Sequence, residues 1–213
     1  MEKTFYIQDY CHIRKGTISR NGKTIFKSSD SDFKSVMKSA YKKLDMDYSK
    51  FFKMDNLSKL AFMAADLLLE KEGEKNMALI FSNSSASLDT DRKHQRSIQD
   101  TAQYYPSPAV FVYTLPNICM GEISIKHQLY SENSFFIFEA FSPHVPHDYA
   151  NCLLTENKAE KALCGWVDMD HGKYDAFLYV VAKKGTFVHS IAEINRLYHT
   201  NEQFKTRIKG ENY

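Results

Sequence analysis

The apolar run at residues 77–82, MALIFS, constrains the fold of this chain more than any other segment. It holds no charged side chain and is short, which is typical of a strand covered on both faces. Directly before it, residues 56–72 place apolar side chains at helical spacing along one face, and Gly73 follows as the expected C-cap. An amphipathic helix followed by a doubly covered strand predicts a parallel sheet with helices packed on it.

The other periodic segments also alternate between strand and helix patterns. Strands are expected at residues 4–10, 134–141, 162–169 and 174–184, and helices at 31–44, 91–103, 114–129, 146–157 and 187–199. Ser31 or Asp32 would cap the first of these helices, and Asp170-His171-Gly172 would form a tight turn between the last two strands. The order βαβαβαββ predicts one α/β domain over residues 1–213, with a mostly parallel five-stranded sheet and helices on both faces.

Charge and cysteine content exclude several classes of function. The chain has 28 Lys plus Arg against 26 Asp plus Glu, a net charge of +2, and no dense basic block. We therefore expect neither nucleic acid nor a membrane among its partners. The first residues alternate between polar and apolar, so no signal peptide is expected and the chain should stay in the cytoplasm. The 4 cysteines form no C-x-x-C pair, which suggests neither a zinc knuckle nor a redox motif. No metal and no cofactor are expected.

Three segments in the middle of the chain fit one family pattern in a fixed register. Thr114-Leu-Pro-Asn117 followed by Gly121 has the form T-x-x-N-x-x-x-G, and residues 162–168 are close to A-x-x-G-G-x-D. The strand SFFIFEA lies between them without insertion or deletion. In this order the segments resemble the active-site region of the β-ketoacyl-acyl carrier protein synthases, or ketosynthases. The resemblance implies the N-terminal half of a thiolase-like fold.

The resemblance also implies that the nucleophile of the family is missing. In ketosynthases this strand ends in a cysteine at the N-terminus of a buried helix, whose dipole lowers the thiol pKa. The register puts Ala140 in its place, and alanine cannot form an acyl thioester. We therefore expect no catalytic residue, and a degenerate site made of Glu139, Ala140, Phe141 and Ser142.

Two further features depart from the family pattern. Pro143 and Pro146 remove backbone N–H donors at the helix start, where the family stabilises an oxyanion. The catalytic histidines of the family belong to a second half of the fold. After the last predicted strand, His189 and His199 lie in no such motif, so the second half is expected to be absent.

The assembly of the family implies partners for this chain. In ketosynthases the strand equivalent to 134–139 pairs across a two-fold axis with a second subunit. We expect a homodimer or a heterodimer with an active ketosynthase, with an acyl carrier protein as a further partner. The expected interface residues are Asn117, Gly121, Phe135, Phe136 and Phe138. Helix 146–157 would also lack its usual cover over Tyr149, Cys152, Leu153 and Leu154.

The leading hypothesis is a non-catalytic ketosynthase-like subunit in acyl carrier protein-dependent fatty acid, aryl polyene or polyketide synthesis. Such a subunit would be similar to the chain-length factors of type II polyketide systems. The alternative is a free-standing acyl-thioester hydrolase or transferase that uses Ser142, with His144 or His147 as base, or Glu139.

The polar groups near this site also have structural explanations. Ser142 is more simply a helix cap, and Glu139, expected at a buried strand end, could pair with Lys126 or His127. A cluster of acid and imidazole groups could hold a metal, but it is also ordinary turn chemistry: Asp168, Asp170 and His171.

Overall fold

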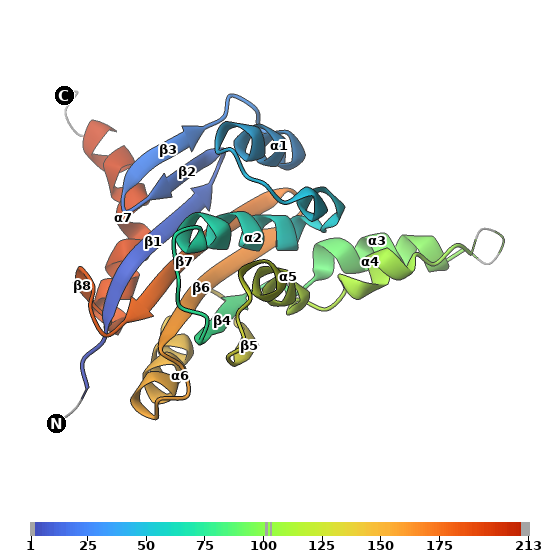
Figure 1. Ribbon diagram of the computed structural model, residues 1–213. Coiled ribbons are helices and arrows are strands. Elements are labelled where there is room, and N and C mark those ends of the chain that lie inside the picture. The colour runs from blue at the N-terminus through green and yellow to red at the C-terminus, as the bar shows by residue number, and fades with distance from the viewer. Residues whose placement is uncertain (1–2, 101, 103, 210–213) are drawn as a thin grey trace.

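The computed structural model describes residues 3–100, 102 and 104–209, with only the backbone of 201–209. Its centre is an 8-stranded sheet in the order β3-β2-β1-β7-β6-β4-β5, with β8 paired to β1 (Figure 1). The strands are β1 Tyr6–Arg14, β2 Thr17–Arg20, β3 Lys23–Lys27, β4 Met77–Asn83, β5 Asn133–Ile137, β6 Lys161–Asp170, β7 Lys173–Ala182 and β8 Phe187–Val188. β4 is parallel to β5 and β6, and β7 is antiparallel to β6 and β1. Among the five strands β1, β4, β5, β6 and β7, only β7 therefore runs in the opposite direction.

The predicted five-stranded sheet is present as β1, β4, β5, β6 and β7, but the complete sheet is larger. β2 and β3 form an antiparallel hairpin beside β1, and β8 pairs with the start of β1. "Mostly parallel" therefore describes the directions of the five predicted strands and not the pairings of the whole sheet. The signals for the missed hairpin are Lys15-Gly16 and Asn21-Gly22, whose φ angles lie between 46° and 76°.

Helices cover both faces of the sheet. They are α1 Phe33–Lys43, α2 Asn56–Leu69, α3 Leu88–Ile98, α4 Pro108–Val112, α5 Ile118–His127, α6 His144–Thr155 and α7 Ile191–Lys209, with a 3₁₀ turn at Ser49–Lys53. α1, α2 and α5 pack on one face, and α6 and α7 pack on the other. α3 and α4 project from the sheet as an arm (Figure 1).

Every residue of β4 is buried, as the MALIFS run predicts. Leu79 and Phe81 belong to the apolar cluster under α1, α2 and α5. Ala78 and Ile80 belong to the cluster under α6 and α7. Alternate side chains of one strand therefore join both halves of the core.

Capping and proline positions set several helix boundaries. Asp32 caps α1, because its carboxylate accepts a 2.9 Å hydrogen bond from the backbone N–H of Ser35. α5 begins after Pro116, which the sequence placed in its first turn. α6 begins at His144, earlier than predicted, and carries Pro146 in its first turn, where a missing N–H costs little.

Other predicted ranges shift by a few residues. α2 ends before Gly73, which is therefore not its cap. The helix expected at 91–103 is α3, and residues 101 and 103 lie outside the described residues. The last helix begins at Ile191, because residues 187–188 extend the sheet as β8. The strand expected at 134–141 ends at Ile137.

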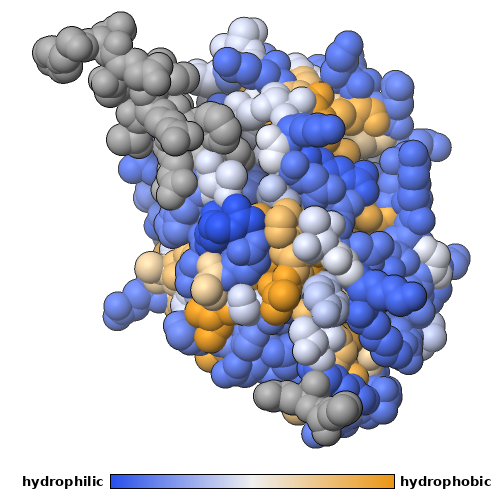
Figure 2. Space-filling view, turned by 90° about the vertical axis from the view of Figure 1, so that its left-hand side faces the viewer, coloured by the Kyte–Doolittle hydropathy of each residue, from blue (hydrophilic) through white to orange (hydrophobic). Residues whose placement is uncertain are grey.

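The side of the molecule that carries α7 and β8 is mostly hydrophilic, with hydrophobic residues gathered near its middle (Figure 2). Within the described ranges, no helix is both long and apolar enough to cross a membrane.

Gly165 allows β6 and β7 to approach closely. Its φ is +150°, and a Cβ there would lie 2.0 Å from the carbonyl oxygen of Phe177. The register pairs Gly165 with Leu178, whose side chain would also be too close. The hairpin that joins these strands turns at His171 and Gly172, both with positive φ, as the sequence predicts.

Gly165→Ala should therefore lower the free energy of unfolding by at least about 2 kcal/mol, because the β6–β7 ladder must open to admit the methyl group. Gly121 in α5 is the matched control, since a Cβ there meets nothing within 4 Å. Gly121→Ala should leave stability unchanged or raise it by up to about 1 kcal/mol. Urea unfolding followed by circular dichroism measures both, and an unchanged midpoint for Gly165→Ala would contradict the steric argument.

Candidate functional site

The predicted site lies at the edge of the sheet where β4, β5 and β6 end. Ligands of α/β proteins bind at the carboxyl ends of parallel strands. Here β5 ends at Ile137 and α6 begins at His144, so residues 138–143 form a loop at this edge, which we call the apical loop. The backbone N–H of Phe138 donates to the carbonyl of Asn83 at 2.9 Å, which ties the start of the loop to the end of β4.

Ala140 is exposed in the apical loop and not at the start of a helix. Glu139 is exposed as well, so the prediction of a buried carboxylate at a strand end is wrong. The strand ends earlier than expected, which turns Glu139 towards solvent. Its proposed partners are engaged elsewhere: Lys126 donates to the carbonyl of Asp47 at 3.0 Å, and His127 pairs with Asp66 at 2.9 Å.

Phe141 is the residue that anchors the apical loop. Its ring stacks on Tyr198 of α7, with 3.7 Å between centroids and 7° between planes. It also meets the edges of Trp166 and Phe177, each at 6.1 Å. We call these four rings the aromatic compartment. Trp166 and Phe177 are buried, so the compartment joins the loop to the core.

A polar network holds Tyr198 from the other side. The Arg14 guanidinium lies 4.3 Å from the centre of the Tyr198 ring, and its Nη1 donates to the Tyr198 carbonyl at 2.7 Å. Asp175 accepts hydrogen bonds from Arg14 Nε at 2.5 Å and from the Tyr198 hydroxyl at 2.6 Å. We call Arg14, Asp175 and Tyr198 the latch. It fixes α7 against the ends of β1 and β7.

Ser142 does not cap α6, which has no side-chain cap hydrogen bond and has Pro143 at its N-cap position. No hydrogen bond in the described part of the chain joins Ser142 to His144 or His147. The predicted nucleophile and base are therefore not brought together.

His147 instead belongs to a group between α6 and the start of α7. Its Nδ1 pairs with Asp148 at 2.8 Å, and its Nε2 lies 3.1 Å from the Asn151 amide. Asn151 Oδ1 in turn lies 2.9 Å from Nδ1 of His189. These contacts fasten α7 to α6.

The predicted uncovered face of α6 is not exposed. Leu153 and Leu154 are buried, together with Ala150, in the cluster under α6 and α7. Tyr149 packs against that cluster, and only Cys152 is exposed. The expectation of an open apolar face on this helix is therefore wrong, because the sheet itself covers it.

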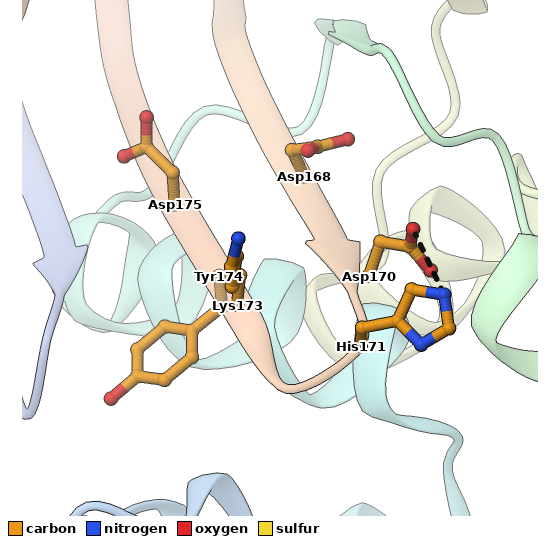
Figure 3. A pocket seen from close by; sticks show the side chains of 6 residues that line it. All are labelled: Asp168, Asp170, His171, Lys173, Tyr174 and Asp175. Atoms are coloured by element: carbon orange, nitrogen blue, oxygen red, sulfur yellow. Dashed lines mark ion pairs between the residues drawn. The ribbon is translucent and has the colours of Figure 1, made fainter.

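The acidic cluster at the β6–β7 hairpin lies at the same edge of the sheet. Asp168 Oδ1 accepts hydrogen bonds from the backbone N–H groups of Ser84 at 3.1 Å and Ser85 at 2.9 Å, which fixes the loop after β4. Arg92 binds Asp170 and lowers the pKa of that carboxyl. Figure 3 shows a pocket of about 260 Å³ lined by Asp168, Asp170, His171, Lys173, Tyr174 and Asp175.

These three carboxylates are paired with other groups of the same chain. Asp170 and Asp175 face arginines, and Asp168 binds backbone amides. Within the residues that the structure describes, no three His, Cys, Asp or Glu side chains are arranged to hold a metal ion. The cluster braces the hairpin and the loop after β4.

The buried cysteines are poor nucleophiles. Burial raises the pKa of Cys11 to about 12 and raises the pKa values of Cys119 and Cys164 well above the ordinary thiol value. Cys152 is exposed and its Sγ lies 3.6 Å from Glu156. None of these thiols lies in the apical loop.

β5 is an edge strand of the sheet. It pairs only with β4, and its far side carries no strand among the described residues. Phe135 and Phe136 are half-buried against opposite clusters, and Phe138 stacks on Phe136 at 6.0 Å. Asn117, at the start of α5, is exposed, and Gly121 has open space around it.

Comparison with known proteins identifies the fold. No protein-family model matches the sequence, and no curated protein matches it. Among solved structures, the ishigamide ketosynthase/chain length factor matches with a TM-score of 0.59 and 16% identity, over 84% of this chain and 62% of that one. The ketosynthase ApeO in complex with its chain length factor ApeC, from Xenorhabdus doucetiae, matches with a TM-score of 0.56 and 15% identity, over 85% of this chain and 80% of that one. AntDE:AntF, a type II polyketide synthase acyl carrier protein in complex with its ketosynthase, matches with a TM-score of 0.55 and 14% identity, over 85% of this chain and 64% of that one.

The chain has a ketosynthase-like thiolase fold. This confirms the predicted fold class, while identities this low show the fold alone. The chain corresponds to less than two thirds of the ishigamide protein that it matches. In this ketosynthase-like fold, the apical loop follows the strand at which the sequence resemblance placed the nucleophile.

Sequence reasoning missed the residues that secure the site. Arg14 and Asp175 face each other across β1 and β7, and Tyr198 joins them from α7. His12 and His189 are both buried near the same elements. Arg14 and Asp175 are direct partners in the β1–β7 register. Their contact could have been predicted only if the pairing of β1 with β7 had been known.

Burial keeps both His12 and His189 uncharged in the folded protein near neutral pH. His12 is 1% exposed, and burial, reinforced by the charge of Arg14, lowers its pKa to about 3 despite the nearby Tyr198 and Leu197 carbonyls. Burial and the neighbouring His147 lower the pKa of His189 to about 3 as well. Nε2 of His189 has no hydrogen-bond partner among the described residues.

The free energy of unfolding should therefore fall as the pH drops below about 6.5, because His12 and His189 become protonated in the unfolded chain but stay neutral in the folded chain. Each histidine contributes a slope of up to about 1.4 kcal/mol per pH unit between its unfolded and folded pKa values. His12→Leu or His189→Gln should flatten the pH dependence of the unfolding free energy between pH 6.5 and about 4. The exposed His171→Gln is the control. A slope unchanged in both buried variants would refute the assignment.

Proposed function

We propose that this chain is a non-catalytic ketosynthase-like subunit that pairs with an active ketosynthase or with a second copy of itself. The observation that carries the proposal is Ala140, exposed in the apical loop after β5, where the family resemblance places a cysteine. The helix that would activate a thiol begins only at His144. We further propose that residues 1–213 act as one domain.

The structures with this fold support a role in carrier-protein-dependent synthesis. They include ketosynthases in complex with a chain length factor and with an acyl carrier protein. By analogy, we propose a place for this chain in fatty acid, aryl polyene or polyketide synthesis, with an acyl carrier protein as a further partner.

The two edges of the sheet support pairing through β5. β3, with the sequence KTIFK, begins and ends in lysine, a charge that protects an edge against other strands. β5, with the sequence NSFFI, has no charged residue. A second subunit that adds to the β5 edge would pair its free backbone groups and extend the sheet.

The arm offers a second apolar surface to the same partner. α3 and α4 lead from β4 to α5, directly before β5. The base of the arm is fixed by hydrogen bonds from Thr90 to Asp55 at 2.7 Å and from Ser87 to the Thr114 carbonyl at 2.7 Å. Large apolar side chains are exposed along the arm and beside it: Tyr104, Tyr105, Phe111, Val112 and Leu115.

The purified chain should show neither condensation nor thioester hydrolysis above a no-protein control, measured by malonyl carrier-protein consumption and by thiol release. Ala140→Cys should not restore condensation, because its thiol would lie in an exposed loop before the helix start. In that variant, alkylation of the introduced thiol should resemble that of the exposed Cys152, with Cys152→Ser as the control background. Labelling by a ketosynthase-directed suicide inhibitor much faster than that of Cys152 would count against a non-catalytic subunit.

Ile137→Lys should abolish pairing without unfolding the chain. Ile137 is 50% exposed at the end of β5, so a charge there opposes a second strand but disturbs little of the core. Phe136→Lys should also abolish pairing, with some loss of stability, because its ring packs on the core. Ile25→Lys on β3, 39% exposed at the opposite edge, is the matched control and should pair normally.

Sedimentation velocity at tens of micromolar measures these outcomes, for the chain alone and mixed with a ketosynthase encoded beside it. Wild-type protein that stays monomeric in both cases would contradict the partner-subunit proposal. Circular dichroism separates lost pairing from lost folding.

A further inference from the structure

Few apolar side chains hold α7 on the sheet. Of its side chains that the structure describes, only Ile194 and Leu197 are buried. The helix follows all the described strands in sequence, and the short strand β8 leads into it. It can therefore leave the sheet by bending after Val188, without breaking a strand pairing (Figure 1). Elements with little apolar burial are the ones that open locally in folded proteins.

Polar groups supply further attachment of α7 in two places. In the middle of the helix, the Tyr198 carbonyl accepts a 2.7 Å hydrogen bond from Arg14, and the Tyr198 hydroxyl donates to Asp175 at 2.6 Å. At the start of the helix, the Asn151 side chain of α6 lies 2.9 Å from Nδ1 of His189. Release of α7 would break both sets of contacts.

A buried histidine lies at each of these places. His12 of β1 is 1% exposed, its ring stacks on Phe177 at 4.7 Å, and it lies beside backbone carbonyl groups of α7. His189, shortly before the helix, is 5% exposed. Both rings would meet water if α7 moved away.

The surroundings of both rings oppose a positive charge while α7 is in place. Arg14 lies near His12, and its own charge disfavours a proton there. His189 faces His147 at 4.7 Å and Tyr179 at 5.9 Å between ring centroids, and its Nε2 has no hydrogen-bond partner among the described residues. In the described part of the chain, the imidazoles that pair with a carboxylate are different ones: His127, His147 and His171.

The carboxylates near α7 have partners of their own. Asp175 belongs to the latch, and Glu193 pairs with Arg196 on the helix itself, which lowers the pKa of Glu193. Asp148 pairs with His147 on α6, and this pair stays on α6 when α7 leaves. Carboxyl groups ordinarily titrate near pH 4, whereas an imidazole in water titrates near pH 6.5. Between pH 7 and pH 5, the histidines therefore dominate any change in the attachment of α7.

We propose that α7 is an acid-released cover, which detaches as one unit below about pH 6 while the sheet stays folded. Release exposes His12 and His189 to water and uncovers the apolar sheet face that includes Phe177 and Tyr179. Each histidine that takes up a proton only in the open form raises the opening constant by up to about tenfold per pH unit. The device is built by this chain alone, so it does not depend on a partner subunit.

Hydrogen exchange of backbone amides, followed by mass spectrometry and corrected for the intrinsic pH dependence of exchange, measures the opening of α7. In wild-type protein, the opening constant of residues 191–200 should rise about fiftyfold from pH 6 to pH 5, because two histidines become protonated in the open form. β4, which is buried on both faces, should stay protected at both pH values.

Histidine variants identify the protons that are taken up. His12→Leu and His189→Gln each remove one proton, so each single variant should show a rise of only about eightfold, and the double variant almost none. His171→Gln, in the exposed hairpin turn, is the matched control and should keep the full rise. The pH dependence is the readout, because a substitution can also shift the opening constant by the same factor at every pH.

Two results with wild-type protein alone would overturn the proposal. In the first, α7 and β4 have the same opening constant at pH 5, which means that the helix opens only when the whole domain unfolds. In the second, the opening constant of α7 is the same at pH 6 and pH 5. A full rise that persists in the folded double variant would also contradict the proposal, because the protons would then bind elsewhere.

Discussion

The burial of β4 on both faces is the constraint on which the rest of the structure depends. Its side chains reach alternately into the cluster under α1, α2 and α5 and into the cluster under α6 and α7. A strand of this kind must sit between neighbours and below helices on both sides. β5 and β6 take the neighbouring positions in parallel, so their carboxyl ends meet at one edge. The apical loop and the β6–β7 hairpin lie there for that reason.

At this edge, several polar side chains make structural contacts with the backbone and with other side chains. Asp168 binds the backbone amides of Ser84 and Ser85, and Asp175 binds Arg14 and Tyr198. The imidazole of His147 is committed to Asp148 and Asn151. These groups, which could otherwise act as bases, are therefore fixed in structural contacts, and the exposed positions carry Glu139 and Ala140.

Local patterns in the sequence predict the elements, and long-range pairing decides the site. The α2 helix, the β4 strand and the His171-Gly172 turn follow from periodicity and turn chemistry within a few residues. Arg14 and Asp175 are separated by 161 positions, and no local pattern joins them. Glu139 was misplaced because the strand ends at Ile137, a boundary set by where β4 stops offering backbone partners. The β2–β3 hairpin was foreseeable from its Asn21-Gly22 turn.

The unequal edges of the sheet also limit the stoichiometry of any assembly that grows by strand addition. Because β3 is flanked by lysines, two molecules joined through β5 would present charged strands at both outer ends of the combined sheet. Such a pair is a closed, isologous unit, and further addition of molecules would stop there. With an uncharged β3, both edges of the sheet in each molecule would be open to strand addition, and the molecules could polymerise into fibres. In such a pair, Lys23 and Lys27 would oppose the addition of further strands.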